Sequence, residues 1–251
     1  MIDSHLHLDQ YKDEEIEKII STSPFIDALI SVSMNLRSAK RNLQLVNKYK
    51  IVKPAFGFHP EQSLPSEQEL EELLNWMADH QKQMIAVGEV GLPYYLRQES
   101  DVKLQAYIEL LEAFIKLAKK WDKPIVLHAV YEDAPIVCDL LEKHSIKKAH
   151  FHWFKGDNIT IERLIRNGYF ISVTPDIVYE EEIQQLAITY PLNQIMVETD
   201  GPWPFEGPFQ GIPTHPEMMN ESISTISILK KLHKDEIYQQ ILHNTKHFYS
   251  V

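Results

Sequence analysis

The sequence has little of what a secreted or membrane-embedded protein usually contains. Its 251 residues include one cysteine, Cys138, so no disulfide can form within the chain. No apolar run approaches the roughly 20 residues that span a bilayer. The first residues, Met1-Ile2-Asp3-Ser4-His5, have neither the basic region nor the apolar core of a signal peptide. We therefore expect a cytoplasmic protein with no membrane segment.

Positive charge is also scarce. The chain has 25 Lys and Arg against 36 Asp and Glu, which gives a formal net charge of −11. This balance disfavours broad, non-specific nucleic-acid binding, because phosphates require positive charge opposite them. It does not exclude a small basic cleft.

Glycine is rare, with 8 residues, and no glycine-rich phosphate loop follows the first predicted strand. The absence of that loop disfavours an open, doubly wound nucleotide-binding sheet, which is the alternative fold. The chain also lacks linkers, low-complexity runs and charge blocks. Its hydrophobic content of 44% is that of an ordinary globular protein. We expect one domain over residues 1–251.

Short apolar runs alternate with longer segments of helical spacing. Runs such as Ile125-Val126-Leu127 are typical of buried parallel strands. The predicted strands are 1–7, 26–33, 52–58, 84–90, 124–128, 147–153, 169–173 and 194–199. The predicted helices are 36–49, 66–79, 101–120, 131–143, 157–167 and 179–189, with two more within 216–248. About eight strand-then-helix units predict a (β/α)₈ TIM barrel with extra C-terminal helices.

Histidines and acidic residues stand at the ends of these predicted strands. In a barrel, the C-terminal ends of the strands form the active-site face. Imidazole nitrogen and carboxylate oxygen together suit divalent ions such as Zn, Mn or Fe, and Mg where more water is retained. The residues concerned are His5, His7, His59, Glu89, His128, His152 and Asp200.

Spacing adds detail to this metal-site prediction. His5 and His7 are two residues apart on a strand, so their side chains are expected to face the same way. Glu89 stands between Gly88 and Val90-Gly91, and glycines allow the backbone and a ligand to approach closely. A carboxylate in this position can bridge two cations about 3.5–4 Å apart. Asp200 leaves a buried strand, where a metal ion or its water would supply the partner that a buried charge needs.

Taken together, these motifs resemble the TatD family of metal-dependent hydrolases over essentially the whole chain. The opening Asp3-Ser4-His5-Leu6-His7-Leu8 alone would indicate only the wider amidohydrolase group. The later motifs follow in the family's order: Gly57-Phe58-His59-Pro60, Gly88-Glu89-Val90-Gly91-Leu92, His128, His152-Trp153-Phe154-Lys155-Gly156 and Glu198-Thr199-Asp200-Gly201-Pro202.

The resemblance implies a TIM barrel that holds two divalent ions. His5, His7, Glu89 and Asp200 would hold one ion, and Glu89, His128 and His152 the other, with Glu89 bridging. Family members include deoxyribonucleases with 3′-exonuclease activity, and some relatives deacylate mischarged transfer RNA.

The sequence departs from the family pattern near the expected substrate. Pro93 stands where an aspartate is usual, and Val130 and Pro213 stand where arginines are usual. Trp153 and Lys155 replace two residues of the sixth-strand motif. A guanidinium binds phosphate through two hydrogen bonds, which neither Val nor Pro can supply. We therefore expect any DNA exonuclease activity to be weak beside that of relatives with both arginines.

The expected chemistry is hydrolysis by a metal-bound hydroxide. Asp200 is the candidate general base and Glu89 the bridging ligand, while His59 would contact a substrate oxyanion or the leaving group. Lys155 and Arg97 are the candidate phosphate contacts. The substrate is expected to be a nucleic-acid end. The alternatives are amide or ester hydrolysis of a small substrate or aminoacyl ester, and a non-catalytic metal-binding protein. No obligate protein partner is indicated.

Overall fold

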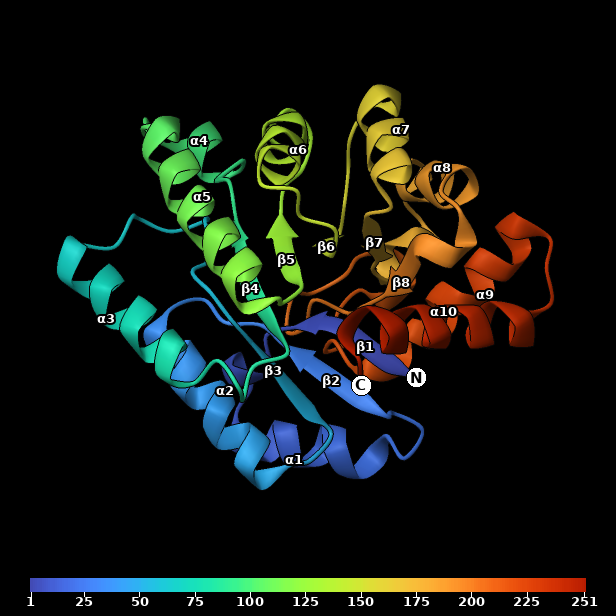
Figure 1. The fold of residues 1–251 in the computed structure, drawn as a ribbon. Coiled ribbons are helices and arrows are strands. Elements are labelled where there is room, and N and C mark those ends of the chain that lie inside the picture. The colour runs from blue at the N-terminus through green and yellow to red at the C-terminus, as the bar shows by residue number, and fades with distance from the viewer.

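The computed structural model describes residues 1–251 and shows eight parallel strands in one sheet, each paired with the next in chain order (Figure 1). The strands are β1 (Ile2–Leu6), β2 (Ala28–Ser31), β3 (Val52–Phe56), β4 (Ala86–Gly91), β5 (Ile125–His128), β6 (Ala149–Phe151), β7 (Phe170–Val173) and β8 (Ile195–Val197). The predicted TIM-barrel fold is confirmed. All eight predicted strands are present, several of them shorter than expected.

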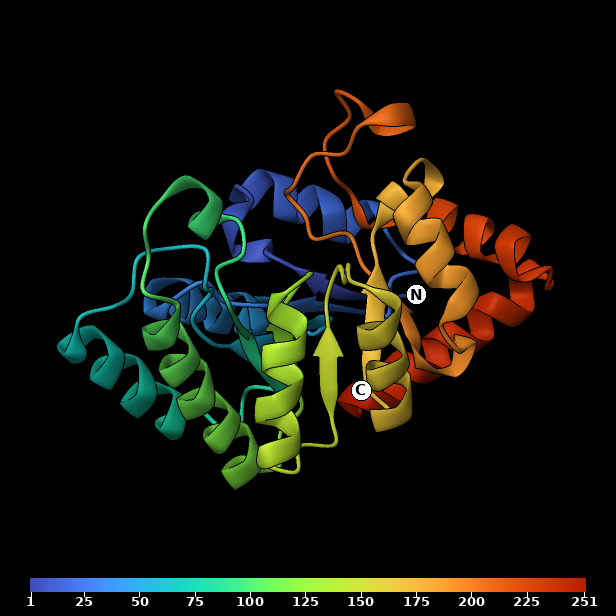
Figure 2. The same ribbon diagram turned by 90° about the horizontal axis from the view of Figure 1, so that it is seen from above.

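Helices cover the outside of the sheet (Figures 1 and 2). They are α1 (Asp13–Thr22), α2 (Leu36–Lys48), α3 (Glu67–Asp79), α4 (Leu96–Glu99), α5 (Leu104–Trp121), α6 (Asp133–Lys143), α7 (Asn158–Asn167), α8 (Glu181–Thr189), α9 (Met219–Lys230) and α10 (Lys234–Tyr249). The two C-terminal helices, α9 and α10, are present as predicted. None of the helices has the length and apolar character needed to cross a membrane.

Helix α1 is the main element that the sequence analysis omits. Its apolar face is short, and only Ile16 and Ile19 are buried. Three acidic residues fill its first turn, where they interact favourably with the positive end of the helix dipole. The helix is therefore stabilised largely by packing two isoleucines on the barrel, which is a weak signal in a single sequence.

The barrel closes between β8 and β1 just beyond the ends of these strands. The Asp200 amide donates to the carbonyl of His5 at 3.0 Å, and the His7 amide donates to the carbonyl of Gly201 at 2.7 Å. The buried Asp3 carboxylate accepts from the Thr199 amide at 3.1 Å and from the Thr199 hydroxyl at 2.5 Å. These bonds fix the residues around Asp200 against those around His5.

The two larger of three hydrophobic clusters support the barrel. The larger packs the strands against the surrounding helices. The smaller one lies inside the barrel and includes Ile2, Ala28, Ala86 and the α10 residues Phe248 and Tyr249. Ile2, Ala28 and Ala86 begin their strands, so the end of α10 covers the N-terminal end of the barrel. The opposite end remains for the functional residues.

Irregularities in β1 and β4 set the direction of the side chains at that open end. The pairing register of β1 with β2 shifts between Asp3 and Leu6, and that of β4 with β5 shifts between Val87 and Val90. Such shifts re-aim side chains in a strand. The first shift spans His5 and the second spans Glu89.

Gly91 lets β4 and β5 approach each other closely. A Cβ at this position would collide with the carbonyl oxygen of His128. Gly91 thus allows two strand backbones to approach each other, whereas the approach of a ligand expected from the glycines around Glu89 stays a prediction. The approach of the strands helps to bring Glu89 and His128 to the same point of the barrel mouth.

Candidate metal centre

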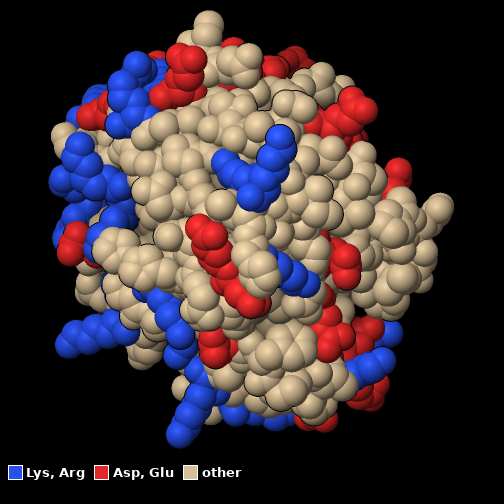
Figure 3. All heavy atoms as spheres, turned by 90° about the vertical axis from the view of Figure 1, so that its right-hand side faces the viewer, with Lys and Arg blue, Asp and Glu red and all other residues tan.

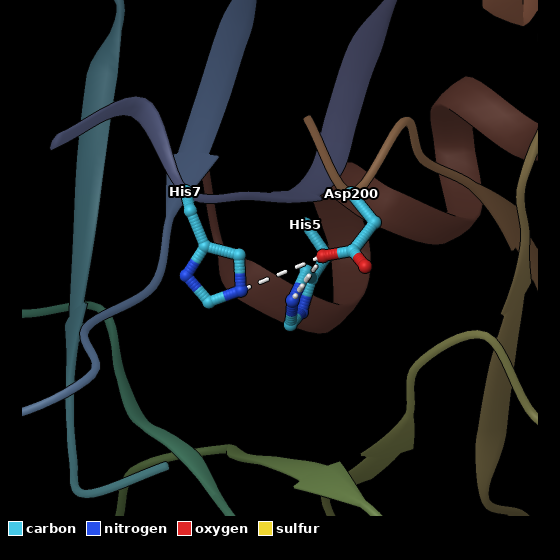
Figure 4. A group of neighbouring side chains, drawn as sticks. All are labelled: His5, His7 and Asp200. Carbon is cyan, nitrogen blue, oxygen red and sulfur yellow. Dashed lines mark ion pairs between the residues drawn. The ribbon is translucent and has the colours of Figure 1, made fainter. Parts of the chain in front are cut away.

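Four of the predicted ligands converge from β1, β4 and the segment after β8. His5 Nε2 lies 3.2 Å from Glu89 Oε2 and 3.3 Å from Asp200 Oδ1. His7 Nε2 lies 3.3 Å and 3.5 Å from the same two oxygens. Figure 4 shows both imidazole rings directed at the Asp200 carboxylate. His7 lies just past the end of β1, so this convergence comes from a turn of the chain rather than from regular strand alternation.

The other oxygen of Glu89 faces a second set of imidazoles. Glu89 Oε1 lies 2.7 Å from His152 Nε2, 3.1 Å from His128 Nδ1 and 3.4 Å from His59 Nε2. The rings of His5 and His152 stack at 3.8 Å between centroids and so join the two sets. Glu89 therefore stands between two groups of nitrogen ligands, with one oxygen toward each.

The first group has the spacing of ligands around one small cation. A tetrahedral ion with bonds of about 2.0–2.1 Å separates its ligand atoms by about 3.3–3.4 Å. The four N···O distances between His5, His7, Glu89 and Asp200 run from 3.2 to 3.5 Å. His5 Nε2, Glu89 Oε2 and Asp200 Oδ1 are buried and have no hydrogen-bond partner in the protein. Because such groups rarely remain unpaired, these atoms fit a bound divalent ion.

The charges in the cluster keep both carboxylates ionised. Burial alone would raise the pKa of Glu89, but the imidazoles of His152, His59 and His5 hold that pKa well below its usual value. Burial opposes ionisation of Asp200 in the same way, and His5, His152 and His7 outweigh it, so the pKa of Asp200 is lowered. These shifts come from protonated rings; a bound metal requires the same ionised carboxylates with its histidine ligands neutral, so metal binding would release protons.

Water reaches the cluster from one side. His5 and Glu89 are fully buried, whereas His7, His59, His128 and Asp200 each keep between 7% and 9% of their surface exposed. A substrate that enters the barrel mouth therefore meets these four residues before Glu89.

Three residues at or near the candidate ligands have left-handed backbone conformations. The ligand Asp200 has a φ of 47°, Trp153 directly after His152 has 37°, and Tyr131, three residues after His128, has 48°. Such conformations are uncommon outside glycine and concentrate at functional sites. They occur here at sharp turns that follow β5, β6 and β8.

Glu198 supports His152 from behind. Its Oε1 lies 3.4 Å from His152 Nδ1 and accepts the Trp153 amide at 2.8 Å. Its Oε2 accepts the Ser172 hydroxyl at 2.5 Å. A carboxylate behind a metal-binding histidine fixes the ring and raises its basicity. Glu198 is thus a positioning residue for His152.

We expect Glu198→Gln to fold normally and to bind divalent metal about 10- to 100-fold more weakly, because the ring of His152 loses its negative partner. Titration with Zn²⁺ or Mn²⁺, followed by calorimetry, measures this change. The matched control is Glu236→Gln on the exposed face of α10, which should bind metal as the wild type does. Unchanged affinity in Glu198→Gln would remove the positioning role.

His59 and a carboxylate that the sequence analysis omits complete the cluster. The Glu61 amide donates to His59 Nδ1 at 3.1 Å, so a neutral His59 carries its proton on Nε2. Glu61 Oε1 lies 3.0 Å from His128 Nε2. Its two oxygens also accept the amides of Tyr95 and Leu96. The one sequence feature that indicates a role for Glu61 is its position two residues after His59.

The two predicted substrate cations lie outside the cluster. Lys155 follows His152 by three residues and sits over the Trp153 ring, with Nζ 5.6 Å from the ring centroid. Arg97 lies in α4, where its guanidinium pairs with the buried Asp133 at 2.7 Å. Lys155 forms no ion pair with a carboxylate, whereas the charge of Arg97 is already balanced.

Comparisons with known proteins identify the family of the chain. A family described as "TatD related DNase" matches residues 2–250. An uncharacterized metal-dependent hydrolase from Haemophilus influenzae is 44% identical, with 99% of each chain covered. The human deoxyribonuclease TATDN3 is 27% identical and covers 97% of this chain and 92% of its own.

Solved structures show the same fold. The crystal structure of YJJV, a TatD homolog from Escherichia coli, superposes with a TM-score of 0.87 at 26% identity, covering 100% of this chain and 98% of the other. A TatD family hydrolase from Entamoeba histolytica has a TM-score of 0.84 at 19% identity, with 99% and 97% covered, which supports the fold. The chain therefore belongs to the TatD family of metal-dependent hydrolases.

Proposed function

We propose that the protein hydrolyses phosphodiester bonds at the ends of nucleic-acid chains and uses two divalent ions per chain. The observation that carries this proposal is the placement of Glu89, whose two oxygens face separate sets of imidazoles. Nucleases and phosphatases commonly use pairs of ions about 3.5–4 Å apart to stabilise the attacking and leaving oxygens.

In this proposal His5, His7, Glu89 and Asp200 hold one ion, and Glu89, His128 and His152 hold the other. When bound, the ions would lower the pKa of a water molecule toward neutrality and polarise the scissile group. Asp200 accepts the proton of the attacking water. Its Oδ1 is buried against His5 and His7, which leaves its other oxygen nearer the solvent side.

His59 acts on the leaving group. Because its Nδ1 accepts the Glu61 amide, its Nε2 carries the proton of the neutral ring. The proton-bearing Nε2 lies at the mouth beside Glu89 and can donate a hydrogen bond to a substrate oxygen. Lys155, which lies over the Trp153 ring and forms no direct ion pair with a carboxylate, supplies positive charge near the mouth.

The surface charge favours binding of a chain end over broad contact with a duplex. On the side seen in Figure 3, lysines and arginines are most frequent along one edge, and scattered residues of both signs with much uncharged surface cover the rest. A groove of about 870 Å³ between α2 and α3 has Arg37 and Lys40 on one wall and Glu69 and Glu72 on the other. A groove of such mixed charge gives little support to a long phosphate track.

A second candidate function is amide or ester hydrolysis of a small substrate by the same residues. The pairing of Arg97 with Asp133 favours it, because only Lys155 then remains as a free cation of the two predicted. Val130 and Pro213, which stand where arginines are usual in the family, add no positive charge. Each lost charge-assisted phosphate contact costs about 1.5–3 kcal/mol, or roughly 10- to 150-fold in binding.

A metal-supplemented screen of phosphodiester, amide and ester substrates separates the two candidates. We expect single-stranded DNA to be degraded from its ends, at least about tenfold more slowly than by a relative that carries both arginines, under matched metal and salt. Hydrolysis of amides or esters alone would overturn the nucleic-acid proposal. DNA activity equal to that of the relative, abolished by Lys155→Ala, would show that Lys155 replaces the arginines.

A further inference from the structure

We propose that Tyr95 and Trp203 form two stacking sites for unpaired nucleobases beside the metal centre. This inference rests on the proposed function and specifies how the end of a nucleic-acid chain is held. It assigns a binding role to two residues that the hydrolytic chemistry does not use.

Both aromatic residues stand directly beside candidate metal ligands. The ring of Tyr95, in the segment after β4, lies 6.1 Å from the ring of His128. The Tyr95 amide is held by Glu61 at 2.9 Å. Trp203 follows Asp200 by three residues, and its amide donates to the Asp200 carbonyl at 3.1 Å. The backbone of each residue is therefore anchored to the cluster.

The two residues come from distant parts of the chain to the same part of the mouth. Tyr95 follows β4, and its ring contacts that of His128 at the end of β5. Trp203 follows β8, and its ring contacts that of Trp153, the residue after His152. Because β5 and β6 are neighbouring strands, both rings lie beside the ligands His128 and His152.

Their exposure distinguishes these residues from the core aromatics. Tyr95 is 47% exposed and Trp203 is 59% exposed. Neither the Tyr95 hydroxyl nor the Trp203 indole nitrogen donates a hydrogen bond within the protein, in contrast to Tyr131 and Trp153, which donate to Glu182 and Asp176. Large aromatic side chains left open at the mouth of a site are suited to contact a ligand.

Each exposed ring is supported by fixed neighbours. The rings of Tyr94 and Tyr95 meet at 88° with centroids 5.1 Å apart, and Tyr94 in turn contacts Tyr131. The rings of Trp203 and Trp153 meet at 72° with centroids 6.3 Å apart. Edge-to-face contacts of this kind hold a ring in place without covering it as a parallel stack would.

Base stacking is the recognition that these rings offer. Every nucleobase has a planar face, and stacking on an aromatic side chain strengthens binding by roughly 5- to 150-fold per base. Bases in a duplex have their faces covered by their neighbours, so only an unpaired end can use both rings. Lys155, beside Trp153, supplies positive charge for the phosphates between the stacked bases.

The test uses the full-length, metal-loaded protein and two short oligonucleotides of equal length. One is single-stranded oligodeoxyadenylate, and the other is an abasic strand with the same number of phosphates. We expect Tyr95→Leu and Trp203→Leu each to raise KM for oligodeoxyadenylate by roughly 5- to 150-fold, with a smaller change in kcat. KM for the abasic strand should stay within about twofold. Tyr95→Phe and Trp203→Phe, which keep the ring, should restore wild-type KM.

The matched control is Phe25→Leu, which removes another exposed aromatic ring. Phe25 is 38% exposed and precedes β2, so it lies at the other end of the barrel, and its loss should leave KM unchanged. Equal KM values in the wild type and both leucine variants, with oligodeoxyadenylate still cleaved, would overturn the stacking sites alone. If the wild type cleaves neither oligonucleotide, the proposed function fails and the stacking sites fail with it.

Discussion

Asp200→Asn is expected to fold normally and to lose hydrolytic turnover by about 100-fold or more, the range for removal of a general base. Asparagine keeps the shape of the side chain but accepts no proton at neutral pH. It also tolerates the left-handed backbone at this position, where φ is 47°, so the turn after β8 should be preserved. The remaining ligands, His5, His7 and Glu89, should still retain metal.

Turnover and metal content must be measured together for this variant. Asp139→Asn is the matched control, because Asp139 is an exposed partner of Arg163 on the outer helices. The control should keep full turnover. An Asp200→Asn protein with full metal content and near wild-type turnover would remove the general-base role, whereas loss of both metal and turnover would identify Asp200 chiefly as a ligand.

Glu89→Gln is expected to cause the largest loss of activity, about 10³-fold or more. Glu89 is the one carboxylate in contact with both sets of imidazoles, and it is fully buried. Its replacement removes the negative charge that both ions would share. Metal ions contribute several kcal/mol to hydrolysis, and about 4 kcal/mol corresponds to 10³-fold in rate. Glutamine has nearly the same shape but removes the anion that the imidazoles face, so a lower thermal unfolding temperature without metal is expected together with the loss of rate.

The control for this substitution is Glu112→Gln on α5. Glu112 pairs with Lys143 and His144 on the outer surface, away from the barrel mouth. The control variant should hydrolyse substrate as the wild type does. Glu89→Gln with turnover within tenfold of the wild type would contradict the bridging role.

The fold could be predicted because buried strands and amphipathic helices alternate along the whole sequence. Runs such as Ile125-Val126-Leu127 are apolar on both faces, as parallel strands covered by helices require. Helix α1 was missed because its buried face consists of only two isoleucines. The predicted strands extend too far along the chain at β6 and β8, because His152 and Glu198 lie in the segments that follow these strands.

The sequence also predicted which residues gather at the mouth, since histidines and acids recur at successive strand ends. It could not predict the register shifts that turn His5 and Glu89 toward each other, because these depend on pairing between distant strands. Nor could the sequence show which charged side chains form ion pairs with side chains of opposite charge. Arg97 and Lys155 look alike in sequence, yet only the structure shows that Asp133 occupies the guanidinium of Arg97.

The metal content of the wild-type protein tests the central claim most directly. Protein stripped with a chelator, reconstituted with excess Zn²⁺ or Mn²⁺ and freed of unbound metal should contain about two ions per chain, because Glu89 presents one oxygen to each of two ligand sets. In Glu89→Gln the ratio should fall below two. A ratio near one in the wild type that Glu89→Gln leaves unchanged would contradict a bridged pair of ions.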